Sequence, residues 1–488
     1  MKSEHASDSR NTLQSESGSP GCQDSAVRPA SVLPWRAEDA VVRPLPEEVF
    51  EAGLRQHHLA NTAYPIAHRT TIWQHRVDED QYAPILRQAL EASPSMSLYA
   101  HVPFCERRCS FCEYTVLDRH VPQDEERYMA ALLRELDLYL DLLGRGQHTL
   151  AGFDIGGGTP SLVQPRHIAT LVERVHGGFR LGEGYGISIE TTPKIAALCP
   201  DTLRAFKIAG IHRISMGLQM ANPRLLREYG RDLNDVTFNR RAVDNIRTAG
   251  FESFNIDVMY GFAKQTVEDV LATLRHTLAL DPEVITLYRM RYKGTKVRGE
   301  ASDIPLERVM AMYLAARALL AEHGYHANPG KNGFSRVAGD PGTSAYLTER
   351  VVHGGPYLGL GLGAQTFTNN ALGYNLGAAS KRLDGYLDAV DARRLPIQDL
   401  YWLPRSEAMA KMVSVAFYFG EIHRPSFAAR FGQTLEQAFP AVLGFVQERG
   451  LMESRGDCLA LTEHGAQHFN GVIALFYSAQ VQQHLLSL

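Results

Sequence analysis

The sequence predicts an α/β fold built on a parallel sheet, and two patterns carry that prediction. From about residue 95 onward, six short apolar runs alternate with segments whose apolar residues recur at helical spacing. A strand that is followed each time by a helix implies parallel strands joined by right-handed crossovers. An open doubly wound sheet and a barrel, complete or partial, both satisfy this order. In either fold the functional site lies at the carboxyl ends of the strands.

The individual elements follow from the same patterns. The expected strands are 97–102, 150–155, 185–190, 212–218, 253–259 and 284–288, and the helices between them include 124–143, 200–209, 235–249 and 266–280. Pro200, Asp235 and Thr266 are residues that favour helix starts, whereas Gly210 and Gly250 favour helix ends.

Composition excludes several classes of protein. The 488 residues are 44% hydrophobic and 21% charged, which is typical of a globular chain. Basic and acidic residues number 50 and 54, and the resulting net charge of −4 gives no reason to expect nucleic-acid binding. No uncharged apolar run reaches the roughly 18 residues that a membrane span needs. Because no apolar signal segment follows Met1, we expect a cytoplasmic protein.

Four segments are expected along the chain. Residues 1–44 are too polar to form a core, so we expect a disordered tail there. Residues 45–94 are expected to form an N-terminal extension that packs on a barrel domain of residues 95–400. Residues 401–488 are expected to form a small helical unit with a two-stranded wing. This last unit has no strong basic cluster, which disfavours binding to DNA.

The most informative motif lies on a loop directly after the first strand. It contains three of the six cysteines, Cys105, Cys109 and Cys112, with the spacing C-x3-C-x2-C. Three thiolates on so short a loop can surround one compact metal centre. Structural zinc sites usually take four protein ligands from two segments, and this chain has no second cysteine pair. Three thiolates suit a [4Fe–4S] cluster with one open iron position, and a zinc site completed by His101 or His120 is the alternative.

Glycines and polar residues mark the ends of the later strands. The stretch GGGTPS at 156–161 follows the second strand, where glycines allow the backbone to approach a ligand closely. It lacks the Lys-Ser/Thr ending of a phosphate-binding loop. One interpretation is a tight turn between strand and helix. The other, suggested by the neighbouring cysteine loop, is a contact with an amino-acid carboxylate or ammonium. Glu190, Gln219 and Asp257 lie at or near the ends of the next three strands, and Arg231 lies on a following loop. Such side chains are the expected lining of a barrel mouth.

The motifs, taken in this order, match a known family. The loop Tyr99-x-His101-x-Pro103-Phe104-Cys105-x3-Cys109-x-Phe111-Cys112 resembles the signature of radical S-adenosylmethionine (SAM) enzymes. Within these it resembles the oxygen-independent coproporphyrinogen III dehydrogenase-like family. The similarity continues through GGGTPSL at 156–162, ISIETTP at 187–193, ISMGLQ at 214–219 and NIDVMYGFAKQT at 255–266. The resemblance implies a partial (β/α)6 TIM-like barrel of the radical SAM type, capped by a small C-terminal winged-helix-like domain.

The resemblance also implies roles for individual residues. Cys105, Cys109 and Cys112 would hold a [4Fe–4S] cluster whose fourth iron binds SAM. The residues expected to contact SAM are Tyr99, Gly157, Gly158, Thr159, Glu190, Gln219, Arg231 and Asp257. One electron from a reductase such as flavodoxin or ferredoxin would then split SAM into a 5′-deoxyadenosyl radical, which abstracts hydrogen from the substrate. No residue is assigned as a catalytic acid or base.

Two departures from the family pattern bear on the reaction. Coproporphyrinogen dehydrogenases carry a further cysteine two positions after the third ligand, where this chain has Tyr114. The haem-chaperone branch carries an HNxxYW-type segment, and the nearest stretch here, 373–376, lacks that histidine and tryptophan. By elimination, the sequence favours the class C methyltransferase branch. There a second SAM provides the methyl group for an sp2 carbon of a small aromatic, unsaturated or tetrapyrrole substrate. Coproporphyrinogen dehydrogenation and non-catalytic haem binding are the alternatives.

A basic segment after the sixth strand bears on the substrate. Between residues 289 and 298, five positions are basic, namely Arg289, Arg291, Lys293, Lys296 and Arg298. At the mouth of a barrel they would attract carboxylates of a second SAM or of an acidic substrate. A solvated loop is the alternative interpretation. The later stretch YLGLGLGA at 357–364 does not fit a dinucleotide-binding motif, and we expect a tightly packed strand or turn there.

Overall fold

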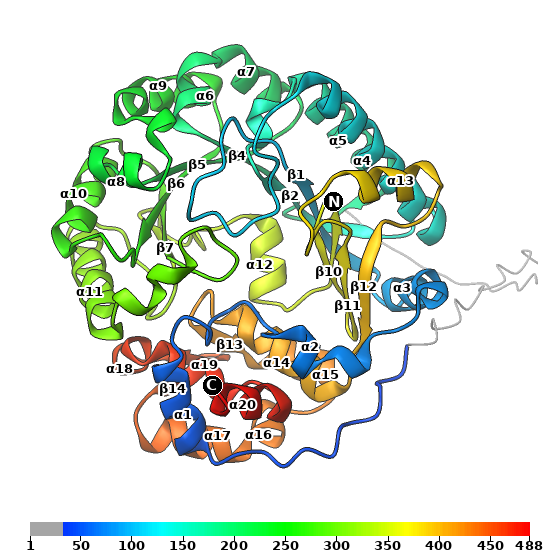
Figure 1. The fold of residues 1–488 in the computed structure, drawn as a ribbon, viewed down its shortest axis with the longest axis vertical. Helices are drawn as coiled ribbons and strands as arrows, with labels where there is room; N and C mark the ends of the chain where they lie inside the picture. Colours follow the sequence, from blue (N-terminus) through cyan, green and yellow to red (C-terminus); the bar gives the residue numbers. More distant parts are fainter. Residues whose placement is uncertain (1–32) are drawn as a thin grey trace, which may run out of the picture.

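A computed structural model describes residues 33–488, and its main element is a twelve-stranded sheet that curves into part of a barrel (Figure 1). Six parallel strands form the centre of this sheet in chain order: β1 (Ser95–Val102), β2 (Thr149–Gly157), β4 (Ile187–Thr191), β5 (Arg213–Gln219), β6 (Ser253–Tyr260) and β7 (Val284–Arg289). They are the six strands that the sequence predicts. The sheet runs from β12 at one edge to β8 at the other, which confirms a partial barrel.

Helices cover the outer face of these strands (Figure 1). They are α4 (Pro122–Leu143), α5 (Pro165–Gly178), α6 (Pro193–Leu198), α7 (Pro200–Ile208), α8 (Pro223–Glu228), α9 (Asn239–Ala249), α10 (Val267–Leu278) and α11 (Leu306–Glu322). Thr266 and Asp269 form a reciprocal capping box at the start of α10. The expected start at Asp235 is wrong for α9, because the Asp235 side chain caps a short 3-10 turn instead, accepting from the Thr237 N–H.

Further strands extend the sheet at both edges. Strand β9 (Tyr357–Leu360) pairs with β1 in parallel, and it is followed by antiparallel β10 (Gln365–Phe367), β11 (Ala371–Asn375) and β12 (Ile397–Trp402). Strand β8 (Gly333–Ser335) is antiparallel to β7, and β3 (Arg180–Leu181) pairs with β2. Helix α12 (Ala345–Val351) lies inside the curve of the sheet, and α13 (Asp384–Asp391) lies outside it (Figure 1). Gly152 of β2 allows α12 to pack closely on the sheet, because a Cβ there would lie 2.2 Å from the Tyr346 nitrogen.

The C-terminal part forms a separate helical unit with a small sheet of its own. Its helices are α14 (Arg405–Ala416), α15 (Arg424–Phe431), α16 (Leu435–Ala438), α17 (Pro440–Glu448), α18 (Glu463–Gln467), α19 (Phe469–Leu475) and α20 (Ala479–Leu486). Helices α16 and α17 are separate because Pro440 starts a new helix. The expected two-stranded wing, β14 (Met452–Arg455) and β15 (Cys458–Leu461), gains a third strand, β13 (Glu421–His423).

The N-terminal extension contacts both of the other parts. Its helices are α1 (Pro46–Arg55), α2 (His68–Thr71) and α3 (Tyr82–Glu91). Helix α3 packs on α4 and the β11–β12 edge of the barrel, whereas α1 lies against α19 and α20 of the C-terminal unit. The expected disordered tail is wrong for residues 33–44, because Leu33 is buried and the Trp402 indole donates to the Pro34 carbonyl at 2.8 Å. Residues 1–32 of that tail lie outside the described part.

None of the helices within residues 33–488 combines the length and the apolar character that crossing a bilayer requires.

Candidate active site

The carboxyl ends of the parallel strands open into one cavity of about 330 Å³. Because these ends share one edge of the sheet, residues far apart in sequence meet there. The cavity lining includes all of the predicted site residues but one: Cys105, Cys109, Cys112, Gly157, Gly158, Thr159, Glu190, Gln219, Arg231 and Asp257. The exception is Tyr99, which lies within β1 with its hydroxyl 3.3 Å from the His101 Nδ1.

The three cysteines of the loop after β1 are free thiols, and each is partly buried. The Cys105 Sγ lies 3.7 Å from the Thr159 hydroxyl, and the Cys109 Sγ accepts from the Arg231 Nη1 at 3.5 Å. Burial raises the pKa of Cys105 to about 12 and also raises that of Cys112. A positively charged metal centre would offset this cost, since it stabilises thiolates directly.

Neither histidine of the zinc alternative is directed at these thiols. The His101 Nε2 is hydrogen-bonded to the Thr115 carbonyl at 2.6 Å, and His120 pairs with Glu125. Both side chains therefore hold the ends of the cysteine loop and are absent from the cavity lining. A donor set of three thiols facing a cavity fits a [4Fe–4S] cluster with an open position better than it fits a four-ligand zinc site.

The glycine-rich turn after β2 packs directly on the cysteine loop. The N–H groups of Gly158 and Thr159 donate to the Val102 and Phe104 carbonyls at 2.8 and 2.7 Å. A Cβ at Gly158 would lie 2.6 Å from the Phe104 oxygen. These two N–H groups are therefore bonded within the chain, as the tight-turn interpretation expects. The glycine is required because two backbone segments meet without space for a side chain.

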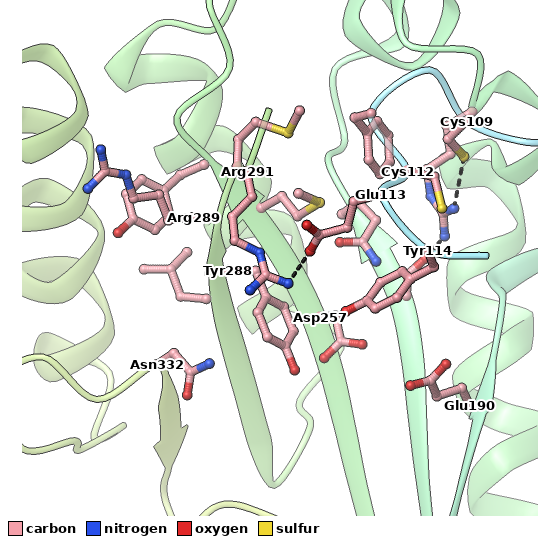
Figure 2. Close-up of a pocket in the computed structure, with 18 of the residues that line it drawn as sticks. Cys109, Cys112, Glu113, Tyr114, Glu190, Asp257, Tyr288, Arg289, Arg291 and Asn332 are labelled. Atoms are coloured by element: carbon pink, nitrogen blue, oxygen red, sulfur yellow. Dashed lines mark hydrogen bonds and ion pairs between the residues drawn. The ribbon is translucent and has the colours of Figure 1, made fainter. Parts of the chain in front are cut away.

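Two carboxylates face the cavity from β4 and β6 (Figure 2). Glu190 accepts from the Gly157 N–H at 3.1 Å, and Asp257 accepts from the Asn255 amide at 2.7 Å and from the Ser215 hydroxyl at 3.0 Å. Burial, together with the neighbouring charge of Asp257, raises the pKa of Glu190 to about 8. A cation bound between these groups would reverse that shift, because it favours the ionised form.

Gln219 and Arg231 carry unsatisfied polar atoms at the same edge. The Gln219 Oε1 and the Arg231 Nε are buried without a hydrogen-bond partner in the described chain. Gln219 also has a φ of 69°, a left-handed conformation that is uncommon for residues other than glycine. Buried polar atoms without partners and unusual backbone conformations both concentrate at binding sites. The four polar residues thus fit a ligand, such as SAM, that carries an amino acid and a nucleoside.

The opposite side of the cavity contains further residues, of which the sequence had singled out Arg291 and Tyr114 but not Glu113, Tyr288 or Tyr418. Arg291 forms an ion pair with Glu113 of the cysteine loop (Figure 2). Its Nη1 donates to the Tyr418 hydroxyl at 3.3 Å. Tyr114 and Tyr288 also line this side. Burial opposes ionisation of Tyr418, but the Arg291 charge lowers its pKa.

The N-terminal extension and the C-terminal unit both contribute to this side. Arg289 donates to the Asn470 Oδ1 and to the His57 Nδ1, each at 2.6 Å. His57, His58 and Asn470 all line the cavity. No motif spacing connects these positions to the cysteine loop, so only the His57–His58 doublet could have drawn attention in the sequence.

The basic segment divides between the two interpretations, because Lys293, Lys296 and Arg298 are exposed and absent from the cavity lining. Arg289 and Arg291 line the cavity, whereas Lys296 pairs with Asp118 outside it. Arg291 is neutralised by Glu113, but Arg289 has only neutral hydrogen-bond partners within the described residues. Buried charges in proteins are normally paired. Arg289 is therefore a cation that suits an anionic group of a ligand.

Comparisons with known proteins agree with this geometry. Residues 99–277 match the family described as the Radical SAM superfamily. The chain is 25% identical over 391 residues to the heme chaperone HemW of Bacillus subtilis (strain 168), covering 78% of this chain and 98% of that protein. It is 32% identical over 272 residues to the oxygen-independent coproporphyrinogen III oxidase of Paracoccus denitrificans (strain Pd 1222), covering 54% of this chain and 58% of that one.

One solved structure has a closely similar fold. The coproporphyrinogen III oxidase (HemN) from Escherichia coli aligns with a TM-score of 0.69 at 22% identity, covering 83% of this chain and 96% of that chain. At this level of identity the likeness concerns the fold.

Proposed function

We propose that this chain, which carries a Radical SAM domain and is similar to haem chaperones and oxygen-independent coproporphyrinogen III oxidases, is an enzyme acting on a tetrapyrrole with carboxylate side chains. The observation that carries this proposal is that one cavity joins the three thiols to Arg289, a partly buried cation without an anionic partner in the described chain. The relatives are named for haem or for coproporphyrinogen, which supports the substrate class.

The thiols of Cys105, Cys109 and Cys112 would hold the cluster, and the polar residues on the β4–β6 side would hold SAM. When bound, the two groups supply a 5′-deoxyadenosyl radical, and the electron comes from an external reductase such as flavodoxin or ferredoxin. Glu190 and Asp257 provide negative charge for the cationic parts of SAM. Gln219 and Arg231 offer the unsatisfied atoms that a polar ligand would bond.

The substrate would occupy the side of the cavity that faces the C-terminal unit. Arg289 can accept a carboxylate there through a charge-assisted hydrogen bond, which is stronger than a bond between neutral groups. The aromatic rings of Tyr288, Phe417 and Phe469 line the same side and suit a flat, apolar macrocycle. The Arg291–Glu113 pair lies between this side and the cysteine loop, so it limits where a substrate carboxylate can bind.

Methyl transfer from a second SAM is a second candidate reaction, and Tyr114 is the observation that favours it. In the coproporphyrinogen dehydrogenases that the sequence resembles, a cysteine stands at this position. Here a tyrosine lines the cavity, 54% exposed, next to Cys112. A cavity without that thiol suits a reaction other than propionate decarboxylation.

Isotope labelling distinguishes the two reactions. The reconstituted protein, reduced under argon, should form 5′-deoxyadenosine faster when ferric haem or coproporphyrinogen III is added. With methyl-deuterated SAM, methyl transfer places deuterium in 5′-deoxyadenosine and yields S-adenosylhomocysteine. Decarboxylation yields unlabelled 5′-deoxyadenosine and no S-adenosylhomocysteine.

Two controls make the result interpretable. Replacing Cys105, Cys109 and Cys112 by alanine should abolish cleavage of SAM, whereas replacing the exposed Cys199 should not. Tight tetrapyrrole binding with no product from either substrate would favour a haem chaperone, and the enzyme proposal would then be wrong.

A further inference from the structure

Two adjacent histidines reach the cavity from the N-terminal extension. Helix α1 ends at Arg55, and the turn that follows brings His57 and His58 to the cavity lining. Their imidazole rings lie with centroids 3.8 Å apart. His57 is 8% exposed, and the ring of His58 also packs edge-on against Tyr292 at 5.4 Å. The proposed SAM site does not use either residue.

The hydrogen bonds of His57 determine which of its ring nitrogens carries the proton. The Arg289 Nη2 donates to the His57 Nδ1, and a guanidinium cannot accept a hydrogen bond. The Nδ1 lone pair is therefore occupied, and in the neutral ring the proton lies on Nε2. The Asn470 amide holds the same turn by donating to the His57 and Ala60 carbonyls at 3.0 and 2.6 Å. His57 is thus a fixed residue without a free lone pair.

His58 has the complementary arrangement. The Ala301 backbone lies beside its ring and favours a proton on the ring nitrogen that faces it. No other polar partner of the ring is found in the described chain, so one nitrogen is available to the cavity. A histidine that ligates a metal almost always donates its other ring N–H to a carbonyl or a carboxylate, which sets the tautomer and the ring orientation. His58 is held in that way before any ligand binds.

Both imidazoles are neutral at physiological pH. Burial, followed by the charge of Arg289, lowers the pKa of His57 to about 3 and that of His58 to about 4. Neutral imidazole is the form that binds transition metals, including the iron of haem. The same cation that suppresses protonation is the one proposed to receive a substrate carboxylate. An imidazole that can bind a metal at the centre of a macrocycle therefore lies next to Arg289, which can bind a carboxylate at its edge.

We propose that the free imidazole nitrogen of His58 is the axial ligand of a metallotetrapyrrole bound in this cavity, and that His57 positions it together with Arg289 and Asn470. This inference rests on the proposed tetrapyrrole substrate and adds that the substrate carries its metal. The segment at 373–376 does not supply the histidine of the haem-chaperone branch. The N-terminal extension supplies one from a different part of the fold.

The test uses the full-length, cluster-reconstituted protein under argon without reductant, so that no turnover occurs. Ferric haem and metal-free protoporphyrin are titrated separately. The oxidised cluster is diamagnetic, so electron paramagnetic resonance reports only the haem iron, and isotope labelling of histidine nitrogen identifies an imidazole ligand. The variants are His58→Ala and His57→Ala, with His323→Ala as an exposed matched control.

The wild type and His323→Ala should show an imidazole-ligated ferric haem. His57→Ala should keep that signature but bind haem more weakly, because His58 is then no longer held in place, and His58→Ala should lose the signature. Loss of the ligand should weaken haem binding by about 10-fold or more and leave binding of metal-free protoporphyrin unchanged. In a His58→Gly variant, added imidazole should restore the signature. This rescue also shows that the variant is folded.

Two results would overturn the inference, and they have different meanings. If His58→Ala keeps the imidazole signature, or if added imidazole fails to restore it in His58→Gly, His58 is not the ligand, while the proposed function stands. If the wild type binds neither haem nor protoporphyrin, the proposed tetrapyrrole substrate is wrong, and the inference is wrong with it.

Discussion

Gly158 is required by close packing of the turn after β2 on the cysteine loop. The sequence suggests that glycine exposes its backbone to a ligand, but its N–H is bonded to Val102 and its Cα faces the Pro103–Phe104 backbone. We expect Gly158→Ala to displace the cysteine loop and to lower the free energy of unfolding by about 1–3 kcal/mol, because overpacked sites must shift their neighbours. Thermal unfolding and iron content after reconstitution measure the two effects. Gly177→Ala is the control, since a Cβ there meets nothing within 4 Å. Equal iron content and stability in the two variants would contradict this account.

If Glu190 binds SAM as proposed, we expect that binding to depend on pH. Its pKa of about 8 is raised by burial and by Asp257, so below that pH the carboxyl group is largely protonated in the free protein. A cationic ligand needs the carboxylate, so binding must release a proton below pH 8 and becomes weaker as the pH falls. The affinity should decrease by at most about 10-fold per pH unit in this range.

Equilibrium dialysis of SAM against the reconstituted protein at several pH values between about 6.5 and 8.5 tests this. In Glu190→Gln the group cannot titrate, so the slope should flatten and the affinity at the highest pH should fall. The amino group of SAM titrates equally in both experiments, so subtracting the pH slope of the variant from that of the wild type removes its contribution. An identical slope in both proteins would place the titrating group elsewhere.

At the scale of elements, α1 determines where the two cavity histidines lie. It packs on α19 through small residues, and a Cβ at Gly53 would lie 2.5 Å from the Asn470 carbonyl and 2.9 Å from the Ala474 Cβ. We expect Gly53→Val to separate the two helices and to cost about 1–3 kcal/mol of stability. Hydrogen exchange should increase across residues 46–60. Glu51→Val, at an exposed position of the same helix, should leave exchange unchanged, and equal protection in both variants would refute the helix contact.

At the scale of the whole molecule, one apolar cluster joins three of the segments that the sequence separates. It includes Phe50 of the N-terminal extension, Tyr357 and Phe367 of the sheet edge, and Phe427 of the C-terminal unit. Because the barrel edge and the cap share this core, we expect them to unfold in one cooperative transition.

Phe427→Ala tests this cooperativity. Phe427 is fully buried, so its truncation should cost about 3–5 kcal/mol. The temperature of cluster loss, followed by absorbance, reports on the barrel, and far-ultraviolet circular dichroism reports on the whole chain. The two transition temperatures should decrease together and by the same amount. A fall in only the dichroism transition would mean that the C-terminal unit unfolds independently.

The sequence by itself determined the six parallel strands, the cysteine loop and the polar residues at the strand ends. These depend on local periodicity, on spacing within one loop and on the rule that parallel strands end at one edge. Only the tertiary structure decided which residues close the cavity from the other side. His57, Asn470 and Tyr418 reach it from segments hundreds of residues apart in sequence, and no local pattern encodes that proximity. The sequence places Arg289 and Arg291 in one basic segment but cannot tell which of the two charges is paired. Only the position of Glu113 makes one of them neutralised and leaves the other as the unpaired cation.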